Sequence, residues 1–193
     1  MKNLLHRILL PYNRLRVEKI SKKILPFINS GDRVLDLGAG NGLVAEYIKN
    51  HKDIKMTLLE IHNGHNQTGL KMQYYDGIKV PFRNNSFDVV LLIYVLHHSE
   101  NPDLTLLEAS RTANKRIIIF EEITNSSIRY FTTSFWDVLV NLPWKVRIVD
   151  LLPRFRSEKR WKESFKKFNL VLEKKILFQK FPNKRVIYVL KKE

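Results

Sequence analysis

The feature that most constrains the fold of this chain is an apolar run with one acid inside it, followed by glycines at alternate positions: Val34-Leu-Asp-Leu-Gly-Ala-Gly-Asn-Gly42. Such an apolar run is typical of a buried parallel strand. Glycines after a strand permit positive φ and a close approach between backbone and ligand. The segment from Leu43 to about Lys49 predicts a helix whose positive N-terminal end faces the turn. The stretch therefore predicts a strand, turn and helix that bind a nucleoside-type ligand.

The glycine spacing separates this turn from the dinucleotide fingerprint G-x-G-x-x-G. The third glycine of that fingerprint would stand at position 43, which is Leu43, whereas the spacing here is G-x-G-x-G. A nicotinamide-dependent dehydrogenase is therefore the least favoured enzyme class. A glycine-rich turn that merely connects two elements stays open as an alternative.

Length and composition indicate one ordinary domain. A chain of 193 residues suits a single domain over residues 1–193. There is no cysteine, so disulfide and thiolate chemistry are excluded, which suits a cytoplasmic location. The longest uncharged apolar run, Val89 to Leu96, is too short to span a bilayer. We predict no metal site, no transmembrane segment and, because His6 and Arg7 interrupt the N-terminus, no signal peptide.

The net charge of +15 is concentrated at the two ends of the chain. Residues 1–30 carry +6 and residues 154–193 carry +10, whereas residues 31–153 carry −1. One interpretation is that the basic flanks contact an anionic substrate, an anionic membrane surface or RNA. A lysine-rich surface that only keeps the protein soluble is the competing interpretation.

Hydrophobic periodicity predicts alternating strands and helices, which indicates an α/β, doubly wound, mostly parallel sheet of Rossmann-like type with an antiparallel C-terminal hairpin. Residues 1–30 are expected to form a basic helical cover, with a helix over Tyr12–Ile28. Further helices are expected from Leu43 to Asn50, Asn101 to Thr112 and Ser157 to Phe168, and over residues 125–152. The predicted strands are Arg33–Leu37, Lys55–Glu60, Lys71–Tyr75, Phe87–Ile93, Arg116–Phe120, Leu170–Gln179 and Lys184–Leu190.

Two acids follow predicted strands, at the edge where open α/β sheets bind ligands. Glu60 ends the second strand and is expected to accept hydrogen bonds from both hydroxyls of a ribose. Asp76 follows the third strand and suits an exocyclic amine of adenine, with Gly77 allowing the backbone to approach the ring. The alternatives are a solvent-facing Glu60 and an Asp76 that serves only its own turn.

A longer run of residues resembles the sequence pattern of a known enzyme family: Asp76-Gly-Ile-Lys-Val-Pro-Phe-Arg-Asn-Asn-Ser-Phe-Asp-Val-Val-Leu-Leu-Ile-Tyr-Val-Leu-His-His-Ser-Glu-Asn-Pro102. It resembles the D-x-x-x-x-P-F…S-F-D-V-V…L-H-H-x-x-x-P pattern of class I S-adenosylmethionine (SAM) dependent methyltransferases. The branch it resembles includes the ubiquinone- and menaquinone-biosynthesis enzymes, the methyltransferase type 11 group. With the glycine turn and Glu60, the resemblance covers about residues 30–120.

This resemblance implies a seven-stranded fold that binds SAM. It implies that the turn surrounds the methionine part of SAM, that Glu60 binds the ribose, that Asp76 and Gly77 bind the adenine, and that Tyr94 to His97 border the sulfonium. The implied cofactor-binding residues are Asp36, Gly38, Ala39, Gly40, Asn41, Gly42, Glu60, Ile61, Asp76, Gly77 and Tyr94.

The chain departs from the family pattern after the fifth strand. Residues 121–156 replace the usual turn and short helix, and we expect them to form a lid over the methyl acceptor. Asp137 and Asn141 are four residues apart, so they share one helix face. They are expected either to bind the acceptor or to cap a neighbouring loop.

Methyl transfer from a sulfonium is an in-line displacement, which requires a base only if the acceptor loses a proton. His97 and His98 are the candidate bases, with Glu121 behind them. A structural role for these histidines stays open. Tyr12 and Arg16 on the N-terminal helix are candidate contacts for the SAM carboxylate, on position alone.

We expect a methyltransferase that acts on a small-molecule or lipid-like acceptor. An RNA methyltransferase recruited by the basic flanks is one alternative, although strand four ends in Ile93-Tyr-Val-Leu96 and not in an N-P-P-Y loop. A non-catalytic module that keeps the fold to bind a partner is the other.

Overall fold

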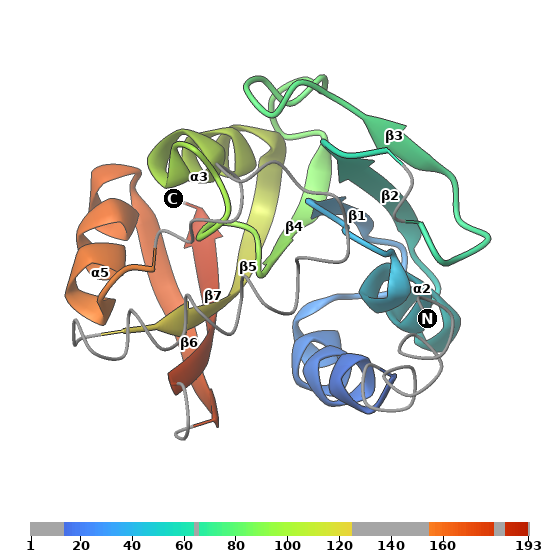
Figure 1. Cartoon of the computed structure of the whole chain (residues 1–193), viewed down its shortest axis with the longest axis horizontal. Helices are drawn as coiled ribbons and strands as arrows, with labels where there is room; N and C mark the ends of the chain where they lie inside the picture. The colour runs from blue at the N-terminus through green and yellow to red at the C-terminus, as the bar shows by residue number, and fades with distance from the viewer. Residues whose placement is uncertain (1–13, 64–65, 125–154, 180–183, 193) are drawn as a thin grey trace, which may run out of the picture.

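A computed structural model of the chain describes residues 14–63, 66–124, 155–179 and 184–192 (Figure 1). Seven strands form one sheet in the order β3-β2-β1-β4-β5-β7-β6. Strands β1 to β5 are parallel to one another, whereas β7 is antiparallel to β5 and β6 is antiparallel to β7. The strands are β1 (Arg33–Leu37), β2 (Lys55–Glu60), β3 (Met72–Tyr74), β4 (Phe87–Ile93), β5 (Ala113–Ile123), β6 (Leu170–Gln179) and β7 (Lys184–Lys192).

Helices cover both faces of the sheet, as the predicted doubly wound architecture requires (Figure 1). A helix over residues 14–24 and α2 (Leu43–His51) pack on one face, where Ile20, Ile24 and Ile48 meet Val34 and other strand residues. On the opposite face α5 (Glu158–Lys167) contributes Trp161 and Phe165, and α3 (Pro102–Thr112) contributes Leu106 and Ala109. The apolar strands are therefore buried on both sides, which explains their nearly continuous hydrophobic runs.

Local sequence signals fix where the helices begin. The Asn101 side chain accepts a hydrogen bond from the Leu104 amide at 3.1 Å, and Pro102 follows it at the first helical position of α3. The Ser157 side chain caps α5 in the same way through the Arg160 amide. The helix over residues 14–24 continues into a 3₁₀ turn, η1 (Leu25–Phe27), and ends before Gly31.

The predicted bounds of β1, β2, β4, β6 and α3 are confirmed, but the prediction for the fifth strand was too short. β5 extends beyond Phe120 to Ile123, because Glu121 and Glu122 pair with Val186 and Arg185 of the antiparallel strand β7. Glu121 therefore lies within β5 and not after it. The last strand also continues to Lys192, and β3 is shorter than predicted at both ends.

Within the described part of the chain, no helix is long and apolar enough to cross a membrane. Residues 125–154, which hold the predicted helix over residues 125–152 and most of the predicted lid, lie outside the described residues, as do residues 1–13 of the basic cover.

Candidate functional site

The predicted site residues meet at the carboxyl edge of the sheet, where β1 lies between β2 and β4. The chain leaves β1 toward one side and β4 toward the other, so this is the switch point at which open α/β sheets bind ligands. The turn after β1 and the segment after β4 are in close contact. A Cβ built on Gly38 would lie 2.6 Å from Cγ2 of Val95, and Gly38 has a φ of +77°. Gly38 is therefore required for packing as well as for conformation.

Gly40 shows where a ligand can approach this turn. Its φ is +56°, and a Cβ built on it would meet no atom within 4 Å. The Gly40 amide donates a 2.6 Å hydrogen bond to Oε2 of Glu60, which ties the glycine turn to the end of β2. The backbone at Gly40 thus borders open space beside a carboxylate, as the expected close approach of a cofactor requires.

Glu60 is buried, so a solvent-facing role is excluded. Its other oxygen, Oε1, accepts hydrogen bonds from the amides of Ile61 at 2.7 Å and His62 at 3.3 Å. A carboxylate has about four acceptor positions, so these three backbone donors leave about one, on Oε2, for a ribose hydroxyl. The second turn of the site is adjacent, because a Cβ on Gly77 would lie 3.2 Å from Cγ2 of Ile61.

Asp76 stabilises its own turn, which is the alternative role that the sequence left open. Its Oδ1 accepts hydrogen bonds from the amides of Ile78 and Lys79, at 2.8 and 3.2 Å. These bonds hold the pKa of the exposed carboxyl below its usual range. The half-exposed Ile61 side chain lies beside Gly77 and supplies an apolar surface of the kind an adenine ring contacts.

Asp36 is the most perturbed acid of the site. Burial, and then the charge of nearby Glu60, raise the pKa of Asp36 to about 7. Its Oδ1 is buried and has no hydrogen-bond partner within the described structure. A buried acceptor without a donor is costly, so the site favours a ligand with a cationic or N–H group at this point. The ammonium of the methionine part of SAM has this chemistry.

Tyr94 lies at the end of β4 in a left-handed backbone conformation with φ of +60°, which is uncommon for a bulky residue and concentrates at functional sites. Its hydroxyl is buried and has no partner in the described part of the chain, and burial raises the pKa of Tyr94. The Arg16 and Arg185 guanidiniums lie 4.8 and 5.7 Å from the centre of its ring. Tyr94 therefore stands between the N-terminal helix and the C-terminal hairpin.

The candidate bases form a buried cluster. Nδ1 of His97 donates to Oε2 of Glu121 at 2.6 Å, and the Leu96 amide donates to Oε1 at 2.8 Å. His97 and Glu121 are almost fully buried, and the ring of His98 lies 4.1 Å from that of His97. Glu121 thus holds the segment after β4 in place. The catalytic roles of His97, His98 and Glu121 stay predictions.

Sequence reasoning missed two contributors. Arg185 of β7 pairs with Glu122 at 2.7 Å and reaches Tyr94, although it is more than ninety positions away along the chain, and no local signal marks it. Residues 66–68 pack on the glycine turn: the Gln67 amide donates to the Asn41 carbonyl, and Thr68 lies 3.1 Å from a Cβ built on Gly42. Asp137 and Asn141 lie outside the described residues.

The fold is that of the class I SAM-dependent methyltransferases. The chain belongs to the methyltransferase domain family, whose model matches residues 10–175. A curated relative, 27-O-demethylrifamycin SV methyltransferase of Amycolatopsis mediterranei, is 29% identical over 96 residues. That stretch is 44% of this chain but only 35% of the relative, so the chain aligns with about a third of it.

Solved structures share the fold at low sequence identity. A chain of a Haloferax volcanii complex that contains the Trm112 methyltransferase activator has a TM-score of 0.71 and 16% identity, covering 90% of each chain. A SAM-dependent methyltransferase of Thermotoga maritima has a TM-score of 0.63 and 18% identity, covering 100% of each chain. The expected fold class is thereby confirmed, and membership of the methyltransferase domain family supports SAM as the cofactor.

Proposed function

We propose that this protein transfers a methyl group from SAM to a small-molecule or lipid-like acceptor. The observation that carries the proposal is the open space at Gly40 beside the Glu60 carboxylate, with the buried Oδ1 of Asp36, which has no partner in the described part of the chain, near Glu60 at the sheet's switch point. When bound there, SAM supplies an electrophilic methyl group on a sulfonium. The residues of this chain bind it, orient the acceptor and exclude water.

The segment after β4 supports an apolar or aromatic acceptor. Tyr94 and Val95 line the carboxyl edge with largely apolar side chains, and the polar groups of His97 and Glu121 are directed into the protein. The curated relative is named for a small-molecule acceptor, 27-O-demethylrifamycin SV. Both observations favour a small or lipid-like acceptor over a nucleic acid.

Titration calorimetry with SAM, with NADH as the control ligand, tests cofactor binding. We expect saturable SAM binding and no response to NADH. Glu60→Ala should weaken SAM binding by about 1–3 kcal/mol, because a buried charged hydrogen-bond partner is lost. Unchanged affinity would remove Glu60 from the site.

Gly40→Val should abolish SAM binding while the protein stays folded, since the added side chain enters the open space and its Cβ meets no protein atom within 4 Å. Gly31→Val is the matched control. Gly31 also has a positive φ, +83°, and no atom within 4 Å of a built Cβ, but it precedes β1 at the other edge of the sheet. Both variants carry similar backbone strain, so equal loss of SAM binding in both would exclude a cofactor at Gly40.

The acceptor class is tested by incubating the protein with cell extract and SAM that carries a labelled methyl group. We expect label in the small-molecule or lipid fraction, and less in the Gly40→Val variant. Label in RNA would establish the RNA alternative. SAM binding without transfer to any fraction would favour the non-catalytic module.

A further inference from the structure

A surface pocket lies at the far edge of the sheet from the proposed cofactor site. It has a volume of about 370 Å³ and lies between the last turns of α5 and the first residues of β6. Leu170 and Val171 of β6 pair with Lys192 and Lys191 of β7, and Lys191 in turn pairs with Arg116 near the start of β5. The pocket is therefore close to the amino end of the parallel strands, and a partner bound there leaves the carboxyl edge accessible.

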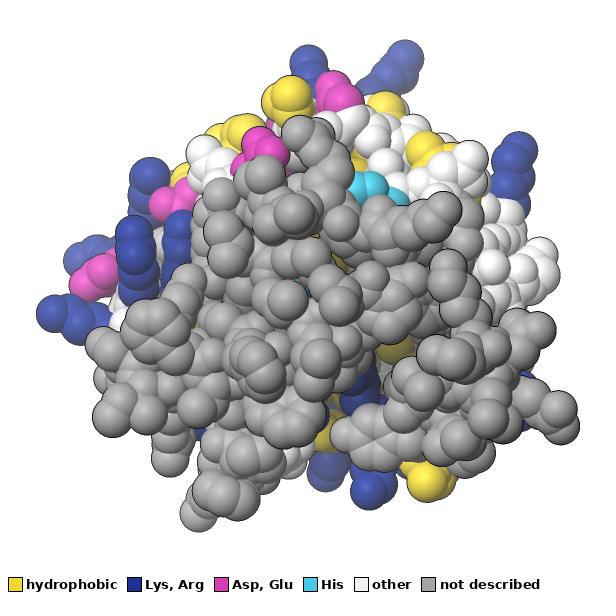
Figure 2. Space-filling model, in the orientation of Figure 1, with side chains coloured by type: hydrophobic (Ala, Val, Ile, Leu, Met, Phe, Trp, Pro, Cys, Tyr) yellow, Lys and Arg dark blue, Asp and Glu magenta, His cyan; other side chains and the backbone are white. Residues whose placement is uncertain are grey.

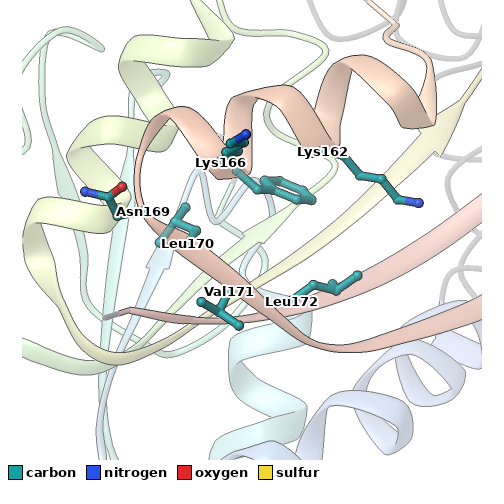
Figure 3. A pocket seen from close by; sticks show the side chains of 7 residues that line it. Lys162, Lys166, Asn169, Leu170, Val171 and Leu172 are labelled. Carbon is teal, nitrogen blue, oxygen red and sulfur yellow. The ribbon is translucent and has the colours of Figure 1, made fainter.

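The pocket combines lysines with aliphatic side chains. Figure 3 shows Lys162 and Lys166 of α5 above Val171 and Leu172 of β6. Val171 is 44% exposed and Leu172 is 37% exposed, and Leu177 further along β6 is 42% exposed. Aliphatic side chains on a ten-residue edge strand are thus open to solvent beside cationic groups.

Four of the seven cations of α5 and β6 take part in no ion pair within the described part of the chain. Lys159, Lys162 and Lys166 follow one another at helical spacing, so they form a stripe along α5. Glu158 pairs with Lys162, Lys175 and Lys184. Lys167 pairs with Asp103, and no acid of the described residues lies within ion-pair distance of the other cations, Lys159, Arg160, Lys166 and Lys174. Figure 2 shows lysine and arginine side chains gathered on the left, where α5 lies in Figure 1.

Protection of an edge strand explains only part of this arrangement. Lysines on an edge strand such as β6 oppose pairing with a second sheet, and Lys174 and Lys175 fit that role. The stripe on α5 lies off the edge, and exposed Val171 and Leu172 would promote association and not prevent it. Like charges on two copies also disfavour a dimer through this surface.

We propose that α5 and β6 form a docking surface for an anionic lipid bilayer. Lysine side chains contact the headgroups, while Val171, Leu172 and Leu177 enter the interface between headgroups and acyl chains. RNA-binding surfaces present exposed aromatic rings and arginines. Here the exposed apolar side chains of α5 and β6 are all aliphatic, and Arg160 is the single arginine in the two elements.

Vesicle co-sedimentation tests the proposal with the full chain. Phosphatidylcholine vesicles are compared with vesicles that also contain phosphatidylglycerol, and salt is titrated. We expect binding to the anionic vesicles alone, weakened by salt. Lys162→Glu with Lys166→Glu should lower the affinity by more than about tenfold, since each basic residue near an anionic surface contributes roughly fivefold.

The matched control is Lys19→Glu with Lys23→Glu, which changes the net charge equally on exposed residues of the N-terminal helix. Circular dichroism melting verifies that both variants are folded. Vesicle binding is measured without SAM, so the result is independent of the proposed cofactor site. An equal loss of vesicle affinity in both double variants would mean that only net charge matters, and it would overturn the proposal. The proposal would also be overturned if single-stranded RNA bound more tightly than the vesicles and the Lys162→Glu, Lys166→Glu variant lost this RNA binding. The surface would then be an RNA-binding surface.

Val171→Ser with Leu172→Ser tests the apolar component. We expect the binding that remains at high salt to disappear, while the salt-sensitive part persists. Unchanged binding at high salt would exclude insertion of these side chains.

Discussion

Asp36 and Glu60 are two acids whose neighbourhoods in the sequence are similar but whose environments differ. Both stand at the end of an apolar strand, yet three backbone amides donate to Glu60, while an oxygen of Asp36 has no donor in the described part of the chain. Sequence reasoning selected both residues, but it did not distinguish a hydrogen-bonded carboxylate from an unpaired one. That difference depends on backbone N–H groups that the turns bring to Glu60: those of Ile61 and His62 directly after β2, and that of Gly40 in the turn after β1.

Asp36 predicts a decline in stability as the pH rises. Its folded pKa of about 7 lies above the ordinary value of 3.8, so the folded state binds more protons than the unfolded state between those values. The free energy of unfolding should therefore fall across this window, by up to roughly 4 kcal/mol, and level off above it. Asp36→Asn, which cannot ionise, should flatten the curve. Urea unfolding at about pH 5 and about pH 8 measures this, and an equal pH dependence in the variant would contradict it.

At the scale of elements, the sequence predicts those whose boundaries are marked locally. β1, β2 and β4 are apolar runs that begin at charged or aromatic residues, and α3 begins at an asparagine cap followed by proline. The end of β5 could not be predicted in this way, because two glutamates interrupt the apolar run. Their partners are Leu96, His97 and Arg185, which are 24 to 63 positions away.

Glu121 is expected to stabilise the segment after β4 from within β5. Glu121→Ala leaves the Leu96 amide and the His97 ring N–H without their acceptor, in a buried environment. At about 1–3 kcal/mol for each unsatisfied donor, the free energy of unfolding should fall by roughly 2–6 kcal/mol. Urea denaturation measures the change. Glu100→Ala, on the exposed part of the same segment, is the control and should change stability by less than about 0.5 kcal/mol.

The whole molecule carries its positive charge at its ends, around a nearly neutral centre. A net charge of +15 is large for 193 residues, so mutual repulsion disfavours the compact state. Moderate sodium chloride screens this repulsion, and it screens the exposed ion pairs as well, but these contribute little stability. We expect the urea midpoint to rise with salt. A fall would mean that the ion pairs around Glu158 and Glu173 outweigh the repulsion.

The order of the strands also bears on how the protein folds. The proposed cofactor site takes residues from the ends of β1, β2, β3 and β4, which become neighbours only through parallel crossovers. Pairings of this kind close long loops and form slowly. In refolding, the capacity to bind the cofactor should therefore appear together with the completed sheet, and a nascent chain that has not yet reached β4 has no site to fill.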